Sequence, residues 1–217
     1  MARENGSVFA ALPRDGVAVF PAGDEHTELW RELAGAAQDR AHEWRQPVLA
    51  TVCPEFGPQA RTVVLREVDV ASRTLLVYTD ARSPKVAQLQ VDPRAQLLCW
   101  SRTLGWQLRL GGRILVSTEG LDVTSRWALL RHTRAAQDYL SPLSPGQPFD
   151  DSGAKTDGDV EGEAQASLDR SRGQRAHFAV MRLRVERMDW LALDPQGHRR
   201  AVFDARDAAL SGRWCAP

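Results

Sequence analysis

The chain has 217 residues, a length that fits one domain, and 43% of them are hydrophobic, enough for a packed core. Its 28 basic and 28 acidic residues give a formal net charge of zero, which excludes the strong positive field that non-specific nucleic-acid binding needs. No apolar run approaches the length of a membrane span, and the first 23 residues lack the unbroken apolar stretch of a signal peptide.

The three cysteines, Cys53, Cys99 and Cys215, are widely spaced and form no CxxC pair. Cys53 and Cys99 stand inside apolar runs, where a cysteine usually behaves as a small buried hydrophobe. This usage is typical of a reducing compartment. We therefore expect a soluble, cytoplasmic protein.

The first half of the chain predicts one helix followed by strands. Residues 24–44 have apolar side chains every three or four positions, which predicts an amphipathic helix. Ser83 is suited to cap a short helix over 84–90, with Pro84 in its first turn. A Gly111-Gly112 pair predicts a bulge in the last of these strands. The β-branched and apolar runs predict strands over 47–52, 61–68, 74–79, 95–100 and 106–117.

The second half predicts a helix, an insertion and the closing strands. Residues 118–137 have a helical pattern, and strand patterns return after Ala176 and again near 199–204, with a turn at 194–197 between them. The stretch 141–175 contains three prolines and many acidic residues, so it buries too little surface to offset its ordering entropy and is expected to be a mobile insertion or lid. The inward positions expected on the helix are Leu121, Trp127, Leu130 and Ala135.

These elements predict an α+β fold in which an antiparallel β-barrel is flanked by helices. We expect one domain over residues 1–217, with the flexible insertion at 141–175 inside it.

Side chains that suit a phosphate stand at the ends of the predicted strands. Arg61 and Arg66 share one strand, and Ser83 and Lys85 stand at the start of a predicted helix. A helix start with a hydroxyl and a cation is an anion site, because its free N–H groups and the helix dipole favour negative charge. The alternative is that Arg61 and Lys85 are solvated surface charges and Ser83 is only a cap. The five histidines lack ligand spacing, so we expect no metal site.

Four ordered segments carry a resemblance to a known family. RTVVLRE (61–67), LVYTDARSPK (76–85), DPRAQLLCW (92–100) and WQLRLGG (106–112) together resemble the pyridoxamine 5′-phosphate oxidase family of FMN proteins, in particular its short bacterial oxidase-related branch. The closing RWCAP is similar to the family's terminal Arg-Leu-x-Pro ending. The resemblance implies an FMN-binding split β-barrel and a homodimer whose FMN sites lie at the subunit interface.

The resemblance also implies which residues contact the cofactor. Arg61 and Lys85 would hold the FMN phosphate, and the backbone of Val63 and Val64 would follow the isoalloxazine edge. Gln107 would reach the flavin of the partner subunit. The full set implied is Arg61, Thr62, Val63, Val64, Leu65, Arg66, Tyr78, Thr79, Ser83, Lys85 and Gln107.

For the substrate the resemblance is less complete. Arg66 stands where the oxidases have a substrate-binding lysine, and Trp127 and Arg131 stand for a tyrosine and an arginine, but Ala135 replaces the serine of that helix. Arg199 is a further candidate anchor, since guanidinium groups suit carboxylates and phosphates.

Two features of the family's phosphate sites are missing from this chain. Pro84 takes the place of an arginine in the family's Ser-Arg-Lys segment, and the Gln-Ser pair of the phosphate pocket is missing. We therefore expect an FMN-dependent oxidoreductase with an unidentified substrate. The alternatives are a genuine pyridoxamine/pyridoxine 5′-phosphate oxidase and a non-catalytic flavin-binding or sensing module.

Overall fold

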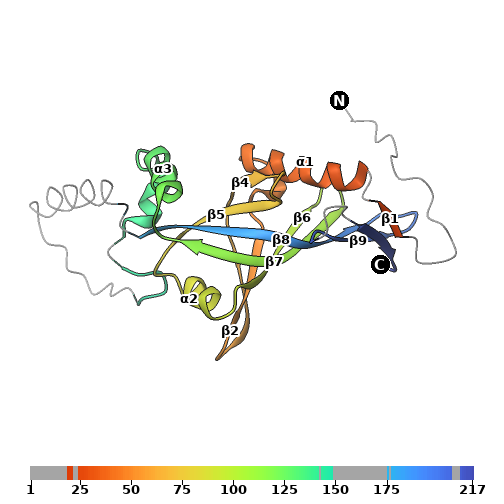
Figure 1. Ribbon diagram of the computed structural model, residues 1–217. Coiled ribbons are helices and arrows are strands. Elements are labelled where there is room, and N and C mark those ends of the chain that lie inside the picture. The colour runs from red at the N-terminus through yellow and green to blue at the C-terminus, as the bar shows by residue number, and fades with distance from the viewer. Residues whose placement is uncertain (1–18, 22–23, 142, 149–174, 176, 207–210) are drawn as a thin grey trace, which may run out of the picture. The chain divides into compact units, whose positions relative to one another are not determined.

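The computed structural model describes residues 19–21, 24–141, 143–148, 175, 177–206 and 211–217. Within them, strands form a sheet in the order β1-β10-β9-β8-β7-β6-β2-β3, while β4 pairs with β5 and β5 with β8 (Figure 1). Every pair whose register is defined is antiparallel. The helices and 3-10 turns are α1 (Asp24–Gln38), η1 (Glu43–Arg45), α2 (Pro84–Val91), α3 (Leu121–Leu130) and η2 (Arg134–Tyr139). The strands are β1 (Val19–Pro21), β2 (Val48–Cys53), β3 (Gly57–Thr62), β4 (Leu65–Asp69), β5 (Thr74–Asp80), β6 (Arg94–Ser101), β7 (Trp106–Ser117), β8 (Phe178–Ala192), β9 (Arg199–Asp204) and β10 (Ser211–Cys215).

The chain divides into two compact units. Unit 1 comprises Met1–Val77, Arg94–Ile114 and Arg182–Pro217, and unit 2 comprises Tyr78–Pro93 and Leu115–Met181. Strands β5, β7 and β8 therefore contribute residues to both units.

The core of unit 1 is rich in tryptophan. The helix α1 packs against β4 and buries the apolar stripe that the sequence pattern predicts, including Trp30 (Figure 1). The ring centroids of Trp44 and Trp106 are 6.5 Å apart, those of Trp106 and Trp190 are 5.4 Å apart, and those of Trp190 and Trp214 are 6.3 Å apart. The Trp106–Trp190 contact is edge-to-face and the other two are tilted. Contacts between such large rings bury much apolar surface, which stabilises the packing of the sheet and η1.

The core of unit 2 is an aromatic cluster around Phe178. The ring of Phe178, which is 2% exposed, lies 5.1 Å from Tyr78, 5.3 Å from Trp127 and 5.3 Å from Tyr139, measured between centroids. These rings come from β5, α3, η2 and β8, so the cluster joins all the main segments of the unit except α2.

Two elements near the N-terminus are shorter than the sequence predicted. The helix predicted over 24–44 ends at Gln38, because Asp39 accepts a hydrogen bond from the N–H of Ala41 and turns the chain before η1. The strand predicted over 61–68 is two strands, since β3 ends at Thr62 and β4 begins at Leu65.

The prediction of a bulge at Gly111-Gly112 was wrong. Strand β7 pairs with β6 in unbroken register through both glycines. A Cβ atom on Gly112 would lie 1.9 Å from the carbonyl oxygen of Arg184, so this glycine permits the close approach of β8. The register shift of the sheet lies instead in β4, between Leu65 and Glu67.

The helix predicted over 118–137 is also shorter. Only α3 is α-helical, and η2 follows as a 3-10 segment whose tighter winding changes the inward positions. Trp127 and Leu130 are buried as predicted, but Leu121 in the first turn is 85% exposed. Ala135 is half-buried, and its neighbour Ala136 takes the inward position.

The closing strands follow the prediction, with β8 and β9 at the expected places, whereas the short strands β1 and β10 were not predicted. Most of the predicted insertion at 141–175 lies outside the described residues. At its described ends, the carbonyl oxygen of Ser141 accepts a hydrogen bond from Arg82 at 2.8 Å, and Arg175 donates to the hydroxyl of Thr124 at 2.8 Å.

Candidate functional site

Three predicted phosphate ligands meet at the start of α2. The Nζ atom of Lys85 donates to the hydroxyl of Thr79 at 3.0 Å and to the hydroxyl of Ser83 at 2.6 Å. Thr79 and Ser83 are 4% and 5% exposed, so the ammonium group is held by hydroxyls that are themselves fixed. These three residues belong to unit 2 and contact one another there, while their predicted contact with FMN stays a prediction.

The local sequence explains why α2 starts here. Ser83 is the N-cap residue with extended backbone, and Pro84 fixes the first helical position. Ser83 makes no side-chain cap, contrary to the expectation, because its hydroxyl accepts the hydrogen bond from Lys85. The first turn of any helix leaves N–H groups without intrahelical partners, and here an ammonium group and two hydroxyls stand beside that turn. This set of donors fits the phosphate of a nucleotide-like cofactor.

A buried ion pair that the sequence reasoning missed fixes the loop before α2. Arg82 donates from Nε to Asp80 at 3.1 Å and from its terminal nitrogen to the other carboxylate oxygen at 2.7 Å. Asp80 is 5% exposed and also accepts the backbone N–H of Arg82 at 2.7 Å. The only sequence signal was an Asp-x-Arg between a strand and a helix. The pair holds in place the residues that lead into Ser83.

Arg61, the other predicted phosphate cation, belongs to unit 1. Its guanidinium donates to the hydroxyl of Thr51 at 2.5 Å and to the carbonyl oxygen of Gln59 at 3.2 Å. Burial lowers the pKa of Arg61 from its ordinary value, but a guanidinium keeps its charge at neutral pH. The structure thus orders Arg61 on the β2–β3 pair of unit 1.

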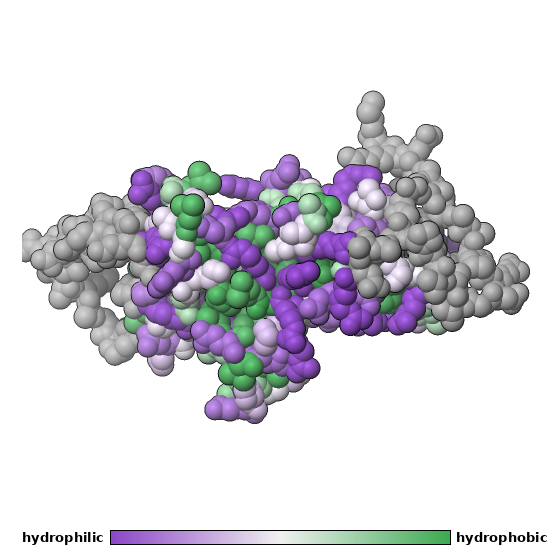
Figure 2. Space-filling view, in the orientation of Figure 1, coloured by the Kyte–Doolittle hydropathy of each residue, from purple (hydrophilic) through white to green (hydrophobic). Residues whose placement is uncertain are grey.

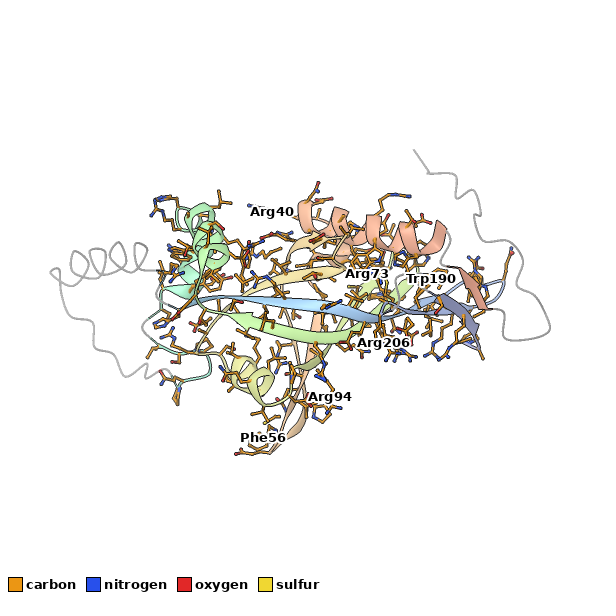
Figure 3. All side chains as sticks on the ribbon, in the orientation of Figure 1. Arg40, Phe56, Arg73, Arg94, Trp190 and Arg206 are labelled. Atoms are coloured by element: carbon orange, nitrogen blue, oxygen red, sulfur yellow. The ribbon has the colours of Figure 1, made fainter. Side chains whose placement is uncertain are left out.

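Gln107 lies on a face of the unit 1 sheet that carries exposed apolar side chains. It stands opposite Trp100 of β6, which is 44% exposed. On the neighbouring strand β2, Val52 is 41% exposed, and Phe56 beyond it is 76% exposed. Figure 3 shows Phe56 at the tip of the β2–β3 hairpin, and Figure 2 shows apolar surface over that hairpin. Gln107 therefore lies beside one exposed apolar side chain, that of Trp100, whereas Val52 and Phe56 lie toward the other end of the strands.

Further predicted cofactor contacts lie at the end of β3, in the break after it and at the start of β4. Thr62 ends β3, Val63 and Val64 form the break before β4, and Leu65 is fully buried. The N–H of Val63 donates to the carbonyl oxygen of Pro47 at 2.9 Å, which holds this break against the start of β2. Their predicted contacts with the flavin stay predictions.

The predicted substrate residues are divided between the units. Trp127 and Arg131 belong to unit 2, while Arg66 and Arg199 belong to unit 1. Trp127 is 2% exposed and packs on Phe178, which accounts for its position by packing alone. Arg131 follows α3 and donates from Nε to the ring of the adjacent His132 at 3.0 Å. Substrate contact by these four residues stays a prediction.

A second cluster that the sequence reasoning missed is centred on Asp189 of β8, in unit 1. Its carboxylate, 6% exposed, accepts two hydrogen bonds from Arg200 of β9, at 3.0 and 2.9 Å, and one from Arg109 of β7. Burial alone would raise the pKa of Asp189, but the hydrogen bonds from Arg200 and Arg109 outweigh it and hold the pKa below its usual value. The one signal was an acidic residue between the apolar side chains of Met188 and Trp190.

Metal and membrane features are absent from the part of the chain that the structure describes. There, no three His, Cys, Asp or Glu side chains gather in a way that would hold a metal ion. No helix of that part is long and apolar enough to cross a membrane.

Cys53, Cys99 and Cys215 are free thiols, and burial raises the pKa of Cys99 to about 12.

Comparison with known proteins agrees with this geometry. Residues 27–118 match the family model described as "Pyridoxamine 5'-phosphate oxidase, FMN-binding domain". The chain is 28% identical to pyridoxine/pyridoxamine 5′-phosphate oxidase 2 of Arabidopsis thaliana over 88% of its own length and 94% of that protein. It is 33% identical to the corresponding oxidase of Granulibacter bethesdensis, but over only 52% of its length and 55% of that protein.

Solved structures show the same fold. A pyridoxamine 5′-phosphate oxidase-related, FMN-binding protein from Nostoc punctiforme aligns with a TM-score of 0.67 at 22% identity, over 91% of this chain and 100% of that one. PhzG from Burkholderia lata, crystallised with tetrahydrophenazine-1-carboxylic acid, aligns with a TM-score of 0.67 at 20% identity, over 89% of this chain and 92% of that one. The α+β prediction of a split β-barrel is confirmed. Residues 27–118 therefore match the FMN-binding domain of the pyridoxamine 5′-phosphate oxidase family, and the chain has the split β-barrel fold of these solved structures.

Proposed function

We propose that this protein is an FMN-dependent oxidoreductase that acts on a small molecule. The observation that carries the proposal is the cluster of Lys85, Thr79 and Ser83 at the start of α2, inside the segment that matches the FMN-binding domain. A cation and two hydroxyls beside a helix N-terminus are the donors that a phosphate monoester requires. The flavin supplies the transfer of electrons, and the protein supplies binding and orientation.

The chain's own residues then have distinct roles. Lys85, Thr79 and Ser83 hold the phosphate, and the ion pair of Arg82 with Asp80 keeps the preceding loop in the conformation that presents them. On the strength of the family resemblance, Arg61 is a second phosphate cation. Losing one charge-assisted contact costs roughly 1.5–3 kcal/mol, or about ten- to a hundredfold in affinity.

We also propose a homodimer in which Gln107 approaches the flavin of the partner subunit. The side chain of Trp100, which stands opposite Gln107 and is 44% exposed, supports a second copy as the occupant of this face. Covering such side chains removes apolar area from water, which favours association. Sedimentation analysis of the purified protein should therefore show a dimer, and a monomer that binds FMN tightly would contradict this assignment.

For the substrate, Arg66, Arg131 and Arg199 are proposed anchors for a carboxylate or phosphate, with Trp127 beside them as implied by the family. Pyridoxamine or pyridoxine 5′-phosphate is the alternative substrate, because the Arabidopsis relative that aligns over 94% of its length has that name. The three free cysteines support a reducing, cytoplasmic setting.

The test is the absorption spectrum of the protein as purified, followed by anaerobic screening of reductants with flavin bleaching as the readout. Yellow protein that a small molecule bleaches supports the oxidoreductase, and bleaching by pyridoxamine 5′-phosphate with formation of the aldehyde supports the alternative. Yellow protein that no metabolite in the screen bleaches favours a flavin-binding or sensing module. Protein that neither contains nor takes up FMN contradicts the proposal.

A further inference from the structure

The side chain of Arg82 connects two segments of unit 2 that are far apart in the sequence. Its Nε and Nη2 atoms donate to the carboxylate of Asp80, in the loop before α2, at 3.1 and 2.7 Å. The Nη2 atom also donates to the carbonyl oxygens of Ser141 at 2.8 Å and Leu143 at 3.3 Å, which follow η2. All four residues belong to unit 2. Arg82 therefore links the loop that leads into α2 to the chain that leaves η2.

The loop before α2 is also held by hydrogen bonds of its backbone. The carboxylate of Asp80, which is 5% exposed, accepts the N–H of Arg82 at 2.7 Å, and the carbonyl oxygen of Asp80 accepts the N–H of Ser83 at 3.1 Å. The N–H of Ala81 donates to the carbonyl oxygen of His177 at 2.7 Å. Three consecutive N–H groups of the loop thus have partners, so a shift of Ser83 should be transmitted to the guanidinium of Arg82.

The segment 143–148 is held by short-range hydrogen bonds. The N–H of Leu143 donates to the hydroxyl of Ser141 at 3.2 Å. Further along, the N–H of Ser144 donates to the side-chain oxygen of Gln147 at 3.1 Å, and the N–H of Gln147 to the carbonyl oxygen of Ser144 at 3.1 Å. The residues of this segment are exposed or half-buried. Short-range hydrogen bonds on an exposed segment open readily, so the charged donor that binds its first carbonyl oxygen should contribute much of its order.

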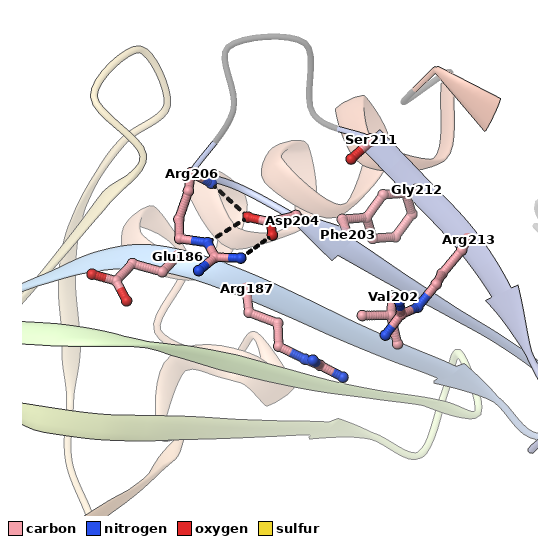
Figure 4. A pocket seen from close by; sticks show the side chains of 9 residues that line it. All are labelled: Glu186, Arg187, Val202, Phe203, Asp204, Arg206, Ser211, Gly212 and Arg213. Atoms are coloured by element: carbon pink, nitrogen blue, oxygen red, sulfur yellow. Dashed lines mark hydrogen bonds and ion pairs between the residues drawn. The ribbon is translucent and has the colours of Figure 1, made fainter. Parts of the chain in front are cut away.

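The tripeptide Asp-Ala-Arg of the loop before α2 occurs again in unit 1, at residues 204–206. There Arg206 donates to Asp204 from its backbone N–H at 3.0 Å, from Nε at 2.9 Å and from Nη2 (Figure 4). The side chains of Arg206 and Asp204 are 70% and 35% exposed, whereas those of Arg82 and Asp80 are 21% and 5% exposed. The chain therefore uses one local pairing twice, and beside α2 this pairing is buried and extends to the carbonyl oxygens beyond η2.

We propose that Arg82 is a positioning residue that couples FMN binding at the start of α2 to the order of residues 143–148. The inference rests on the proposed function, because it takes the FMN phosphate as the ligand of the cluster around Lys85. A phosphate that holds Ser83 restricts the loop, and the loop holds the guanidinium of Arg82 against the carbonyl oxygens beyond η2. Coupling between two sites is reciprocal, so order in the segment 143–148 strengthens FMN binding in return.

Two variants separate this positioning role from a simple effect of charge. Arg82→Lys keeps the positive charge but loses the planar fork that reaches Asp80 and the two carbonyl oxygens at once. Asp80→Asn removes a negative charge beside an anion site. By charge alone this change would strengthen FMN binding, whereas loss of the partner that orients Arg82 should weaken it. Arg206→Lys and Asp204→Asn, in the same tripeptide of unit 1, are the matched controls.

FMN binding to flavin-free protein is measured by fluorescence titration, and hydrogen exchange of peptides that cover residues 143–148 is measured without FMN and at saturating FMN. Arg82→Lys and Asp80→Asn should each raise the FMN dissociation constant at least about fivefold, while the controls match wild type. Saturating FMN should slow exchange of these peptides in wild-type protein and in the controls, but not in the two variants. Circular dichroism verifies that each variant is folded.

An unchanged dissociation constant in Arg82→Lys or Asp80→Asn, or FMN-dependent slowing of exchange that persists in them, would overturn the coupling. Tighter FMN binding by Asp80→Asn, or wild-type protein that binds FMN without slower exchange, would overturn it as well. If Arg82→Lys fails to fold, the same two measurements on Asp80→Asn decide the question. Wild-type protein that takes up no FMN would instead count against the proposed function, so the two failures are distinguishable.

Discussion

Lys85 in unit 2 and Arg200 in unit 1 are both cations whose side chains are fixed by buried partners, but the partners differ in charge. Lys85 donates to the hydroxyls of Thr79 and Ser83, two neutral groups that order the ammonium group. Arg200 and Arg109 both donate to the carboxylate of Asp189, whose charge balances one of the two guanidinium groups. The first arrangement suits a site that receives an anion, whereas the second suits a structural link between β8 and β9. The comparison shows why a cluster must be judged by the charge of its partners.

The largest effect should follow from removing the charge of Asp189. Asp189→Asn leaves two guanidinium groups beside a nearly buried neutral amide, and breaking a buried ion pair costs about 3–5 kcal/mol. Because Arg109 and Arg200 are about a third exposed, we expect the low end, about 3 kcal/mol, in urea unfolding. Asp138→Asn, at an exposed position, is the control and should change stability by no more than about 0.5 kcal/mol. If Asp189→Asn changed the free energy of unfolding as little as Asp138→Asn does, the interactions of Asp189 with its two arginines would contribute nothing to stability.

A second variant tests the close packing of β7 on β8 that this link requires. Gly112→Ala would place a Cβ atom 1.9 Å from the carbonyl oxygen of Arg184, so the strands must separate. We expect a loss of about 1–3 kcal/mol in thermal or urea unfolding, as for other overpacked positions. Gly111→Ala is a matched control, since nothing lies within 4 Å of its added Cβ. Equal stability of the two variants would disprove the close approach.

His26 differs from both Lys85 and Arg200, because the fold holds its imidazole ring in the neutral form. Trp30 donates from its indole nitrogen to Nε2 of His26 at 2.6 Å, which requires that nitrogen to be unprotonated. Burial, together with the charge of Arg73, lowers the pKa of His26 from 6.5 to about 4. The unfolded chain takes up a proton below about pH 6.5 and the folded chain does not. The stability contributed by neutral His26 is therefore present above pH 6.5 and lost as the pH falls toward 4.

The measurement is the free energy of unfolding of wild-type protein and His26→Gln between pH 7 and pH 4. Glutamine has a carbonyl oxygen that accepts from Trp30 but does not titrate, so the variant should lose less stability over this range. With allowance for the partial exposure of His26, we expect a difference on the order of 1 kcal/mol. Parallel pH profiles would show that His26 is not held neutral.

Strands β2, β5, β6, β7, β8 and β9, helix α2 and the Lys85 cluster were predictable from the sequence, because these depend on local patterns. Runs of apolar and β-branched residues indicate β2 and β5, alternation of polar and apolar residues indicates β7, and a proline after Ser83 indicates the start of α2. The cluster around Lys85 could be found from the order of the motifs, because its residues come from β5 and α2, which are adjacent in the chain.

Contacts between residues far apart in the sequence were not predictable. The link of Asp189 to Arg109 spans 80 residues, and Arg82 reaches Ser141 across 59 residues. Gly112 is likewise explained only by the approach of β8, since the sequence alone cannot distinguish a bulge from a close contact. Strand β10 was missed because its five residues follow no long apolar run.

The most direct test of the account is the FMN affinity of Lys85 variants, measured by fluorescence titration of the protein freed of flavin. Lys85→Met keeps the length of the side chain but removes the charge, and we predict an FMN dissociation constant about ten- to a hundredfold higher. Lys85→Arg, whose planar fork does not reproduce a compact ammonium group, should weaken binding less. Arg134→Gln, at an exposed position of unit 2, controls for net charge and should match wild type. An unchanged dissociation constant in Lys85→Met would contradict the assignment of the phosphate to the start of α2.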